Sequence, residues 1–189
     1  MNPYNKFKLW FNLAKKDKKT DPTAFALGTI NNNSPNIRMV LLKYVKPNGF
    51  VFFTNLNSVK GKNFLKNQNL SMCFYWESIN RQVRINGKGD LISEEDSDKY
   101  FLKRPRGSQI GAWASNQSSE IPNNKYLKKR VAHYEKKYFG LKIPRPKYWR
   151  GIIIKPKNFE FWSQGNYRLH NREFYFLRGG VWNKKILSP

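Results

Sequence analysis

Two arginines and a histidine recur at alternate positions near the C-terminus, as Arg168, His170 and Arg172 in the stretch WSQGNYRLHNREF. Alternate side chains of a β-strand share one face, so an extended backbone would project all three to the same side. Such groups repel one another unless something anionic lies between them. The pattern is compatible with a nucleic-acid patch, a catalytic base or a cage for an anionic small molecule, and equally with a solvated basic edge. It does not favour a metal centre, because no carboxylate, histidine or cysteine follows at ligand spacing.

A second group lies in KYFLKRPRGSQIGAWASNQSS, where Tyr100, Arg104 and Ser108 recur every fourth residue. On a continuous helix they would share one face, although Pro105 and Gly107 interrupt the helical pattern. A phenol, a guanidinium and a hydroxyl together suit a phosphate, which needs several donors. An ordinary basic helix end is the alternative. Further neutral donors surround the apolar IGAWA: Gln109, Gln117, Ser118 and Ser119. This mixture suits a ligand that has both a phosphate and a ring.

A third group comes from two expected strands. In IRMVLLKY, Arg38 and Lys43 lie at the two ends of an apolar run and on opposite strand faces. Charges in such places usually extend from sheet edges into solvent, but they can also mark two anion sites. In RQVRINGKG, Gln82 and Arg84 share a face, which is a weak signal when taken alone.

The charge of the chain is strongly basic, with 36 Lys and Arg against 12 Asp and Glu and a formal net charge of +24. This balance is typical of nucleic-acid-binding proteins. Much of the excess, however, is lysine scattered alongside asparagine, as in NNNSPN and NKYLKKR, which a codon bias of the source genome would also produce. The aromatic residues fall mostly in core-like strand positions, not along an exposed surface. We therefore expect no specific nucleic-acid partner.

The length of 189 residues suffices for one domain, and an aromatic content of 16% is too high for a disordered chain. Cys73 is the single cysteine, which excludes an intramolecular disulfide and a multi-cysteine metal site and fits a reducing cytosol. No stretch approaches the roughly 20 apolar residues of a membrane span, and the N-terminus has no signal-peptide core. We expect a cytoplasmic protein without a membrane partner.

The elements that must position these groups are mostly strands. Asn2 and Pro3 are typical of a helix start and predict a helix within residues 1–19. Further helices are expected at 58–67, 93–102, 107–115 and 121–140. Strands are expected at 23–30, 37–45, 50–54, 69–77, 81–92, 151–162, 172–177 and 181–187. Short turns join the strands, so we predict a mainly β (α+β) protein, a β-barrel with peripheral helices, as a single domain over residues 1–189.

Taken together, these stretches resemble the pyridoxamine 5′-phosphate oxidase family. The resemblance is carried, in family order, by DPTAFALGTI, RMVLLK, FFTNLNSVK, RQVRINGKG, YFLKRPRGSQIGAWASNQSS, PRPKYWRG, EFWSQGNYRLHNR and WNKKILSP. The most specific parts are RPRGSQIGAWAS and RLHNR. The resemblance implies an FMN-binding split β-barrel and a homodimer with FMN sites at its interface. It also implies oxidation of pyridoxamine or pyridoxine 5′-phosphate to pyridoxal 5′-phosphate, with O₂ reoxidising the flavin to give H₂O₂.

The same resemblance implies roles for individual residues. Arg38 and Lys60 would hold the FMN phosphate. The remainder of the FMN site would comprise Met39, Val40, Leu41, Leu42, Lys43, Phe53, Thr54, Ser58, Gln82, Gln117, Ser118, Trp162 and Arg172. The substrate phosphate would be bound by Lys43, Tyr100, Arg104 and Ser108. Arg168 and His170 would lie over the substrate ring beside the reacting carbon as the catalytic residues, and which of them acts as a base stays open.

The absence of an N-terminal extension and three single residues depart from the family pattern. Family members commonly carry an N-terminal extension that closes over the substrate, whereas this chain begins almost at its first helix. We therefore expect that lid to be absent and do not assign its role to Tyr4. Val59 stands where an arginine is usual, which would remove one FMN phosphate contact. Phe53 replaces a frequent tyrosine, and Asn171 a frequent aspartate.

Two other functions stay open at this point. A split-barrel flavin or deazaflavin reductase could use the same fold on another substrate, and a flavin-binding protein without activity would need fewer of these residues. Two phosphorylated ligands in one pocket would bring roughly four negative charges, given a second phosphate pKa near 6. Several separate basic clusters, as found here, are what such a pair requires. The sequence does not indicate whether the amine or the alcohol substrate is preferred.

Overall fold

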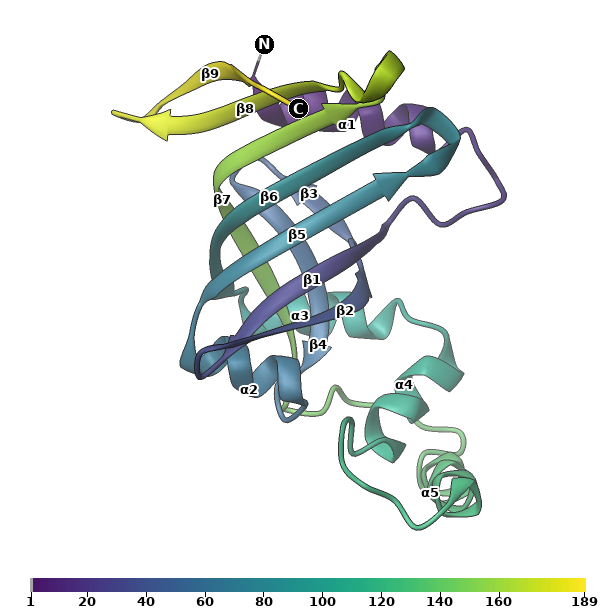
Figure 1. The fold of residues 1–189 in the computed structure, drawn as a ribbon. Helices are drawn as coiled ribbons and strands as arrows, with labels where there is room; N and C mark the ends of the chain where they lie inside the picture. The colour runs from purple at the N-terminus through teal and green to yellow at the C-terminus, as the bar shows by residue number, and fades with distance from the viewer. Residues whose placement is uncertain (1) are drawn as a thin grey trace.

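The computed structural model describes residues 2–189. Its strands are β1 (Ala24–Asn31), β2 (Ser34–Leu41), β3 (Tyr44–Lys46), β4 (Gly49–Asn55), β5 (Asn69–Trp76), β6 (Arg81–Leu91), β7 (Trp149–Ser163), β8 (Asn171–Arg178) and β9 (Val181–Leu187). They form one antiparallel sheet in the order β2-β1-β5-β6-β7-β4-β3, and β8 and β9 extend it as a hairpin beside β7. Figure 1 shows that the sheet curls into a barrel.

Five α-helices lie outside the sheet within the described range: α1 (Pro3–Ala14), α2 (Val59–Lys66), α3 (Glu94–Leu102), α4 (Arg106–Ala114) and α5 (Asn124–Lys137). Short 3₁₀ turns occur at Glu77–Ile79 and Asn166–Arg168. The prediction of a mainly β protein with peripheral helices is confirmed. Among residues 2–189, no helix combines the length and the apolarity that a membrane crossing requires.

One predicted strand, 37–45, is divided in the structure. β2 ends at Leu41 and β3 begins at Tyr44, because the chain leaves its pairing with β1 and joins β4. The backbone N–H of Leu42 donates to Thr23 O, and that of Lys43 donates to Val51 O, each at 2.8 Å. This bend keeps the side chain of Leu42 in the core and turns that of Lys43 toward a cavity.

The long strand β7 pairs with two different strands along one of its edges. It pairs with β6 along most of its length, while its other edge pairs with β4 through residues 149–154 and with β8 through residues 158–163. β4 and β8 therefore diverge from a single edge. Trp149 and Trp162 mark the two ends of β7 and, at about 3.3 Å per residue, lie tens of ångströms apart along the strand.

The helix α1 closes one side of the main core. Asn2 caps it and Pro3 begins it, as predicted. The buried ring of Phe7 lies 4.7 Å from Phe50 and 5.2 Å from Phe74, measured between ring centroids. Tyr4 stacks on Phe50, and burial raises the pKa of its phenol to about 12. Tyr4 is thus partly buried against the main core.

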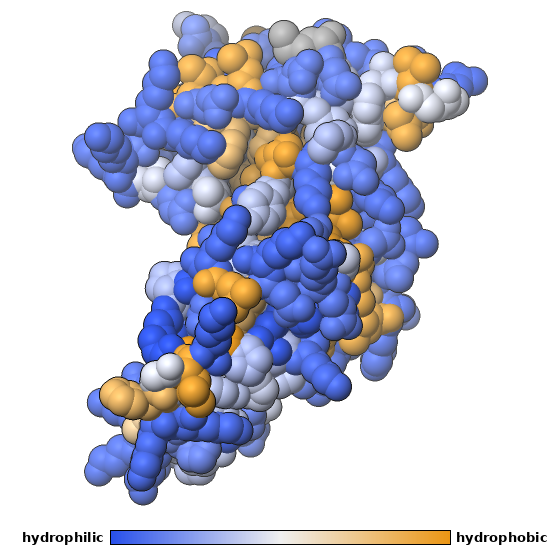
Figure 2. Space-filling model, turned by 180° about the vertical axis from the view of Figure 1, so that it is seen from behind, coloured by the Kyte–Doolittle hydropathy of each residue, from blue (hydrophilic) through white to orange (hydrophobic). Residues whose placement is uncertain are grey.

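A second, smaller core joins the helices α3, α4 and α5 to the start of β7. It consists of the buried side chains of Phe101, Ile110, Tyr138, Ile143 and Trp149. Figure 1 shows α4 and α5 projecting beyond the barrel, on the side opposite the β8–β9 hairpin. Figure 2 shows a largely hydrophilic surface that is hollowed where this helical part leaves the barrel. The second core therefore fixes the helices that complete a cavity.

Candidate functional site

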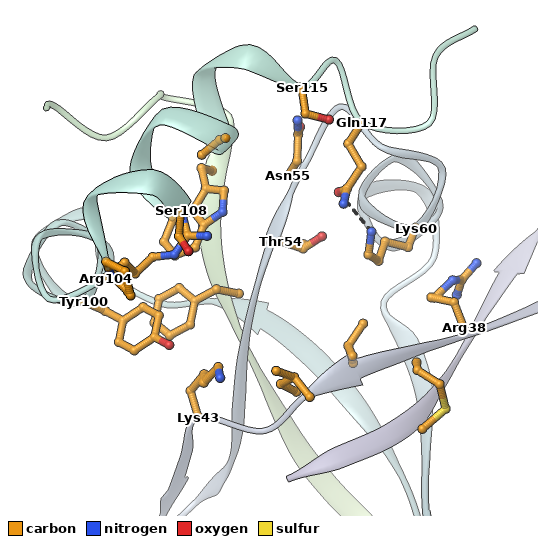
Figure 3. A pocket seen from close by; sticks show the side chains of 18 of the residues that line it. Arg38, Lys43, Thr54, Asn55, Lys60, Tyr100, Arg104, Ser108, Ser115 and Gln117 are labelled. Carbon is orange, nitrogen blue, oxygen red and sulfur yellow. Dashed lines mark hydrogen bonds between the residues drawn. The ribbon is translucent and has the colours of Figure 1, made fainter. Parts of the chain in front are cut away.

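A cavity of about 820 Å³ lies between the barrel and the helices α3 and α4. Most of the residues singled out from the first two thirds of the sequence line it: Arg38, Met39, Val40, Leu41, Lys43, Phe53, Thr54, Lys60, Tyr100, Arg104, Ser108 and Gln117. Figure 3 shows Arg38 and Lys60 on one side and Lys43, Tyr100, Arg104 and Ser108 on the other, with Thr54 between them. Within the described residues, no aspartate or glutamate lines the cavity.

The first side of the cavity is formed by Arg38 from β2 and Lys60 from α2. Arg38 Nη1 donates to Thr29 Oγ1 at 2.7 Å and to the carbonyl of Leu27 at 3.1 Å. Lys60 Nζ donates to Gln117 Oε1 at 3.0 Å. Burial lowers the pKa of both cations, and the charge of Arg38 lowers that of Lys60 further. Two desolvated cations held together without a counter-charge form a receptor for an anion.

The second side carries the four residues expected to bind a substrate phosphate. The helix that would place Tyr100, Arg104 and Ser108 on one face is interrupted, as Pro105 and Gly107 indicated: α3 ends at Leu102 and α4 begins at Arg106, with Pro105 as its N-cap. The break still brings the three side chains, with Lys43, to one cavity wall. Ser108 lies in the first turn of α4, where the helix dipole favours an anion.

Gln109 has a different role from the one its sequence position suggests. It was grouped with the neutral donors around a ligand, but it is buried, and its Nε2 donates to the carbonyls of Phe101, Leu102 and Arg104 at 3.1–3.2 Å. Carbonyls at and just beyond the end of a helix lack their i+4 partners; that of Phe101 also accepts from the backbone N–H of Arg104 at 3.1 Å. Gln109 therefore stabilises the break between α3 and α4 and so the position of Arg104.

Two buried polar atoms in the cavity wall have no partner among residues 2–189: Thr54 Oγ1 and Arg104 Nη1. An unsatisfied buried donor is costly, at about 1–3 kcal/mol or more for a charged group. Burial also lowers the pKa of Arg104 and raises that of Tyr100, which remains a protonated donor at neutral pH. The donor set on both sides thus fits two phosphate groups, and the apolar lining between them fits rings.

Arg168 and His170 lie elsewhere, in a shallow hollow formed by residues 164–170. The predicted shared strand face of Arg168, His170 and Arg172 is wrong, because residues 166–168 form a 3₁₀ turn and β8 begins only at Asn171. Tyr167 and Arg168 have positive φ angles of 53° and 65°, a backbone state that a strand does not contain. His170 packs on the indole of Trp162, 4.7 Å between centroids.

Arg172 is separated from this hollow and paired. Its Nε and Nη2 donate to Glu160 Oε1 at 2.9 and 2.8 Å, and Arg84 Nη1 donates to Glu160 Oε2 at 3.2 Å. The anion expected between basic groups is therefore supplied, for Arg172, by a carboxylate of the chain itself. Gln82 and Trp162 are register partners in β6 and β7, and Trp162 is the register partner of Arg172.

The remaining expected site residues do not line the cavity. Leu42 lies in the main core, and Ser58 is buried as the N-cap of α2, where its Oγ accepts from Gly61 N at 3.3 Å. Ser118 is exposed with a φ of 69°. Conversely, sequence reasoning missed four polar or aromatic lining residues: Asn55, Lys103, Ser115 and Trp149. Each lies within a sequence motif that carries the family resemblance, and this position is the signal that could have identified it.

The two groups of expected site residues lie at opposite ends of the chain's fold. The turn before β8 is at the end of the barrel near the hairpin, while α3 and α4 are at the other end (Figure 1). Arg168 and His170 of one chain therefore do not reach the cavity of the same chain. The domain boundaries and the roles assigned to individual residues stay predictions.

Comparisons with known proteins agree along the chain. Residues 14–138 match the family described as pyridoxamine 5′-phosphate oxidase, and residues 149–189 match the pyridoxine 5′-phosphate oxidase C-terminal dimerisation region. The pyridoxine/pyridoxamine 5′-phosphate oxidase of Zymomonas mobilis is 45% identical over 100% of this chain and 98% of that protein. The protein of the same name from Chelativorans is 44% identical over 99% and 90% of the two chains.

Solved structures agree on the fold. PhzG from Burkholderia lata, determined in complex with tetrahydrophenazine-1-carboxylic acid, has a TM-score of 0.94 at 27% identity and covers 100% of this chain and 93% of its own. A pyridoxamine 5′-phosphate oxidase-related, FMN-binding protein from Nostoc punctiforme has a TM-score of 0.79 at 13% identity, with coverage of 100% and 99%. The predicted split-barrel fold is confirmed. The chain belongs to the pyridoxamine 5′-phosphate oxidase family.

Proposed function

We propose that this protein is an FMN-dependent oxidase that converts pyridoxamine and pyridoxine 5′-phosphates to pyridoxal 5′-phosphate in vitamin B6 metabolism. The observation that carries the proposal is the cavity itself, which has desolvated cations on two sides, Arg38 and Lys60 on one and Arg104 on the other, and no carboxylate among the described residues. A flavin phosphate on one side and a substrate phosphate on the other would satisfy both sets. The names of relatives at 44–45% identity support the same activity.

The FMN phosphate would bind Arg38 and Lys60, with Gln117 beside them. Bound FMN would supply the acceptor for a hydride equivalent from the substrate, and O₂ would take up the electrons to give H₂O₂. Oxidation of the amine substrate also consumes one water and releases ammonia. Oxidation of the alcohol substrate consumes no water and releases no ammonia. The chain's own task is to hold the two ligands in contact and to exclude other acceptors.

Lys43, Tyr100, Arg104 and Ser108 would hold the substrate phosphate and thereby set the position of the ring relative to the flavin. Arg168 and His170 would lie over that ring and assist removal of the proton from the substituent that is oxidised. Because these two residues lie at the other end of the fold, we infer that they come from a second copy of the chain. The proposed homodimer would then carry two sites, each shared between protomers.

Two further observations support such a dimer. The match of residues 149–189 to a dimerisation region covers β7, Arg168 and His170. In addition, the outward side chains of β2 are apolar and exposed, with 73% of Ile37 and 63% of Met39 accessible. Met39 also lines the cavity. An apolar strand face beside an incomplete site suits coverage by a protein partner.

The test is direct. The purified protein should show flavin absorbance, either as isolated or after addition of FMN, and should migrate as a dimer. Addition of pyridoxamine 5′-phosphate in air should then yield pyridoxal 5′-phosphate, ammonia and H₂O₂ in equal amounts. Protein that binds no FMN would contradict the proposal. Flavin-dependent reduction of another substrate, with no turnover of the B6 phosphates, would replace it by the reductase alternative.

A further inference from the structure

The guanidinium of Arg104 is held by aromatic faces instead of by a carboxylate. Its central carbon lies 4.6 Å from the ring centroid of Trp149 and 5.5 Å from that of Phe101. Within residues 2–189 no ion pair involves Arg104, and its Nη1 is buried without a partner. A cation resting on an aromatic face keeps its in-plane N–H donors available, whereas a carboxylate would occupy them. The aromatic rings therefore hold Arg104 in place while its N–H groups remain free to donate to a ligand.

Trp149 belongs to a stack of three nearly parallel rings. Its indole lies 5.0 Å from Phe53 with planes 10° apart, and Phe53 lies 4.0 Å from Tyr100 with planes 13° apart. The three rings come from β7, β4 and α3, which are remote in sequence. Tyr100 also lies 6.1 Å from Trp149 with planes 5° apart, so the three ring centroids form a triangle and not a column. Arg104 rests on Trp149, and Tyr100 stacks on Phe53 and Trp149, so two of the four expected phosphate-binding residues pack on this one group of rings.

The sheet leaves room for the ring of Phe53. In the pairing of β4 with β7, Phe53 lies opposite Gly151. A Cβ atom at Gly151 would lie 2.8 Å from Phe53 Cε1 and 2.4 Å from Ile92 Cδ1. A glycine opposite an aromatic residue lets the ring lie flat across the neighbouring strand. The position of the stack is therefore set by the rigid sheet and not by the loops around it.

We propose that Trp149 and Phe53 are positioning residues that hold Arg104 and Tyr100 as a ready-made receptor for the phosphate of the substrate. This inference rests on the proposed function and deepens it. The stack acts on the phosphate end of the ligand only. It therefore selects phosphorylated over unphosphorylated B6 compounds and contributes little to the chemical step.

The decisive variant is Trp149→Leu, compared with Trp149→Phe, which keeps an aromatic face. We expect Trp149→Leu to raise KM for pyridoxine 5′-phosphate about tenfold, the value of a desolvated cation–π contact, with kcat changed less than about twofold. For unphosphorylated pyridoxine, kcat/KM should stay within about twofold. Trp149→Phe should recover most of the loss. Trp182→Leu, which removes an indole packed on Phe159 at the other end of the fold, serves as the matched control and should leave KM unchanged.

A binding measurement separates this inference from the proposed activity. Calorimetric titration of the unreacted protein with pyridoxal 5′-phosphate, and with pyridoxal as control, requires no turnover. Trp149→Leu should weaken binding of the phosphate compound about tenfold and leave binding of pyridoxal unchanged. If Trp149→Leu weakens binding of pyridoxal 5′-phosphate alone, but the wild-type protein oxidises neither B6 phosphate, the proposed function fails and the positioning role stands. Equal losses for both ligands, or an unchanged affinity for the phosphate, would overturn the positioning role.

Discussion

The cavity and the 160–172 segment are both rich in arginine, yet their charges are balanced differently. In the cavity, Arg38 and Arg104 have lowered pKa values caused by burial and take part in no ion pair within the described residues. In the C-terminal segment, Arg172 shares the carboxylate of Glu160 with Arg84. The cavity arginines are thus available to bind an anion from a ligand, whereas Arg172 is already held by a carboxylate of the chain. Net charge alone would not have distinguished them.

The difference extends to how each region is stabilised. The cavity wall leaves Thr54 Oγ1 and Arg104 Nη1 without hydrogen-bond partners. These atoms lower the stability of the ligand-free protein and are free to bind a ligand. In the C-terminal hairpin the carboxylate of Glu173 is paired: it accepts from Lys6 Nζ of α1 at 2.5 Å and from the hydroxyl of Tyr175 at 2.9 Å. We therefore expect ligand binding to stabilise the cavity most. Four predictions follow from this contrast in order of expected effect.

The largest effect is expected for Arg168→Ala. Because Arg168 is proposed to lie over the reacting end of the substrate, its removal should lower kcat by roughly 10²-fold or more, while FMN absorbance is retained. Arg178→Ala, an exposed arginine at the other end of β8, is the matched control and should remain active. Steady-state kinetics with pyridoxamine 5′-phosphate test this, and unchanged turnover in Arg168→Ala would show that the assignment is wrong.

The second prediction tests whether the two regions meet across a dimer. Arg168→Ala and Arg104→Ala homodimers should each be nearly inactive. Mixing them after partial unfolding should restore about a quarter of wild-type activity, because half of randomly paired dimers are mixed and each mixed dimer has one intact site. A site contained within one chain would show no restoration, so the absence of recovery despite subunit exchange would exclude the shared arrangement.

The third prediction compares an unpaired with a paired charge. Lys60→Met should weaken FMN binding roughly 10- to 100-fold, the value of a charge-assisted contact. It should leave the stability of flavin-free protein unchanged or slightly higher. Glu160→Ala should instead destabilise flavin-free protein by about 1–3 kcal/mol, because it leaves Arg172 and Arg84 without their partner. FMN titration and urea unfolding measure the two effects, and equal destabilisation by both variants would remove the distinction.

The smallest effect is a pH dependence of opposite sign in the two regions. The lowered pKa of Lys60 means that the unfolded chain binds more protons there, so flavin-free protein should gain stability as pH rises toward the ordinary value of 10.5. Burial and the hydrogen bond to Glu173 raise the pKa of Tyr175 from 10.0 to about 12, so its contribution is lost as pH rises through that range. Urea unfolding of wild type, Lys60→Met and Tyr175→Phe between about pH 8 and about pH 11 separates the two contributions.

Local features of the fold could be predicted from the sequence. The caps of α1, α2 and α3 are formed by Asn2, Ser58 and Ser93 as their side-chain chemistry indicates. The strand patterns were also sufficient for β1, β5 and β6. The predictions that failed lie where a tertiary contact overrides a local pattern. The division between β2 and β3 depends on hydrogen bonds from residues 42 and 43 to two different segments, Thr23 just before β1 and Val51 in β4.

The candidate site shows the same limit. Even spacing suggested one strand face for residues 168–172 and one helix face for residues 100–108. The first fails because Tyr167 and Arg168 adopt left-handed backbone angles, and the second because a proline separates two helices. In the second case the residues still converge, since Gln109 ties the end of α3 to the start of α4. Convergence on a cavity does not require a shared periodicity.

By itself, the sequence determined which residues could meet a phosphate, that the protein is mainly β and which family it resembles, because residue chemistry and short-range periodicity are local properties. Only the tertiary structure decided which cations are free. Arg84 lies opposite Glu160 through the register of β6 and β7, and Arg172 reaches the same carboxylate from β8. Those partners are brought together by long-range strand pairing, which a linear pattern of charges does not encode.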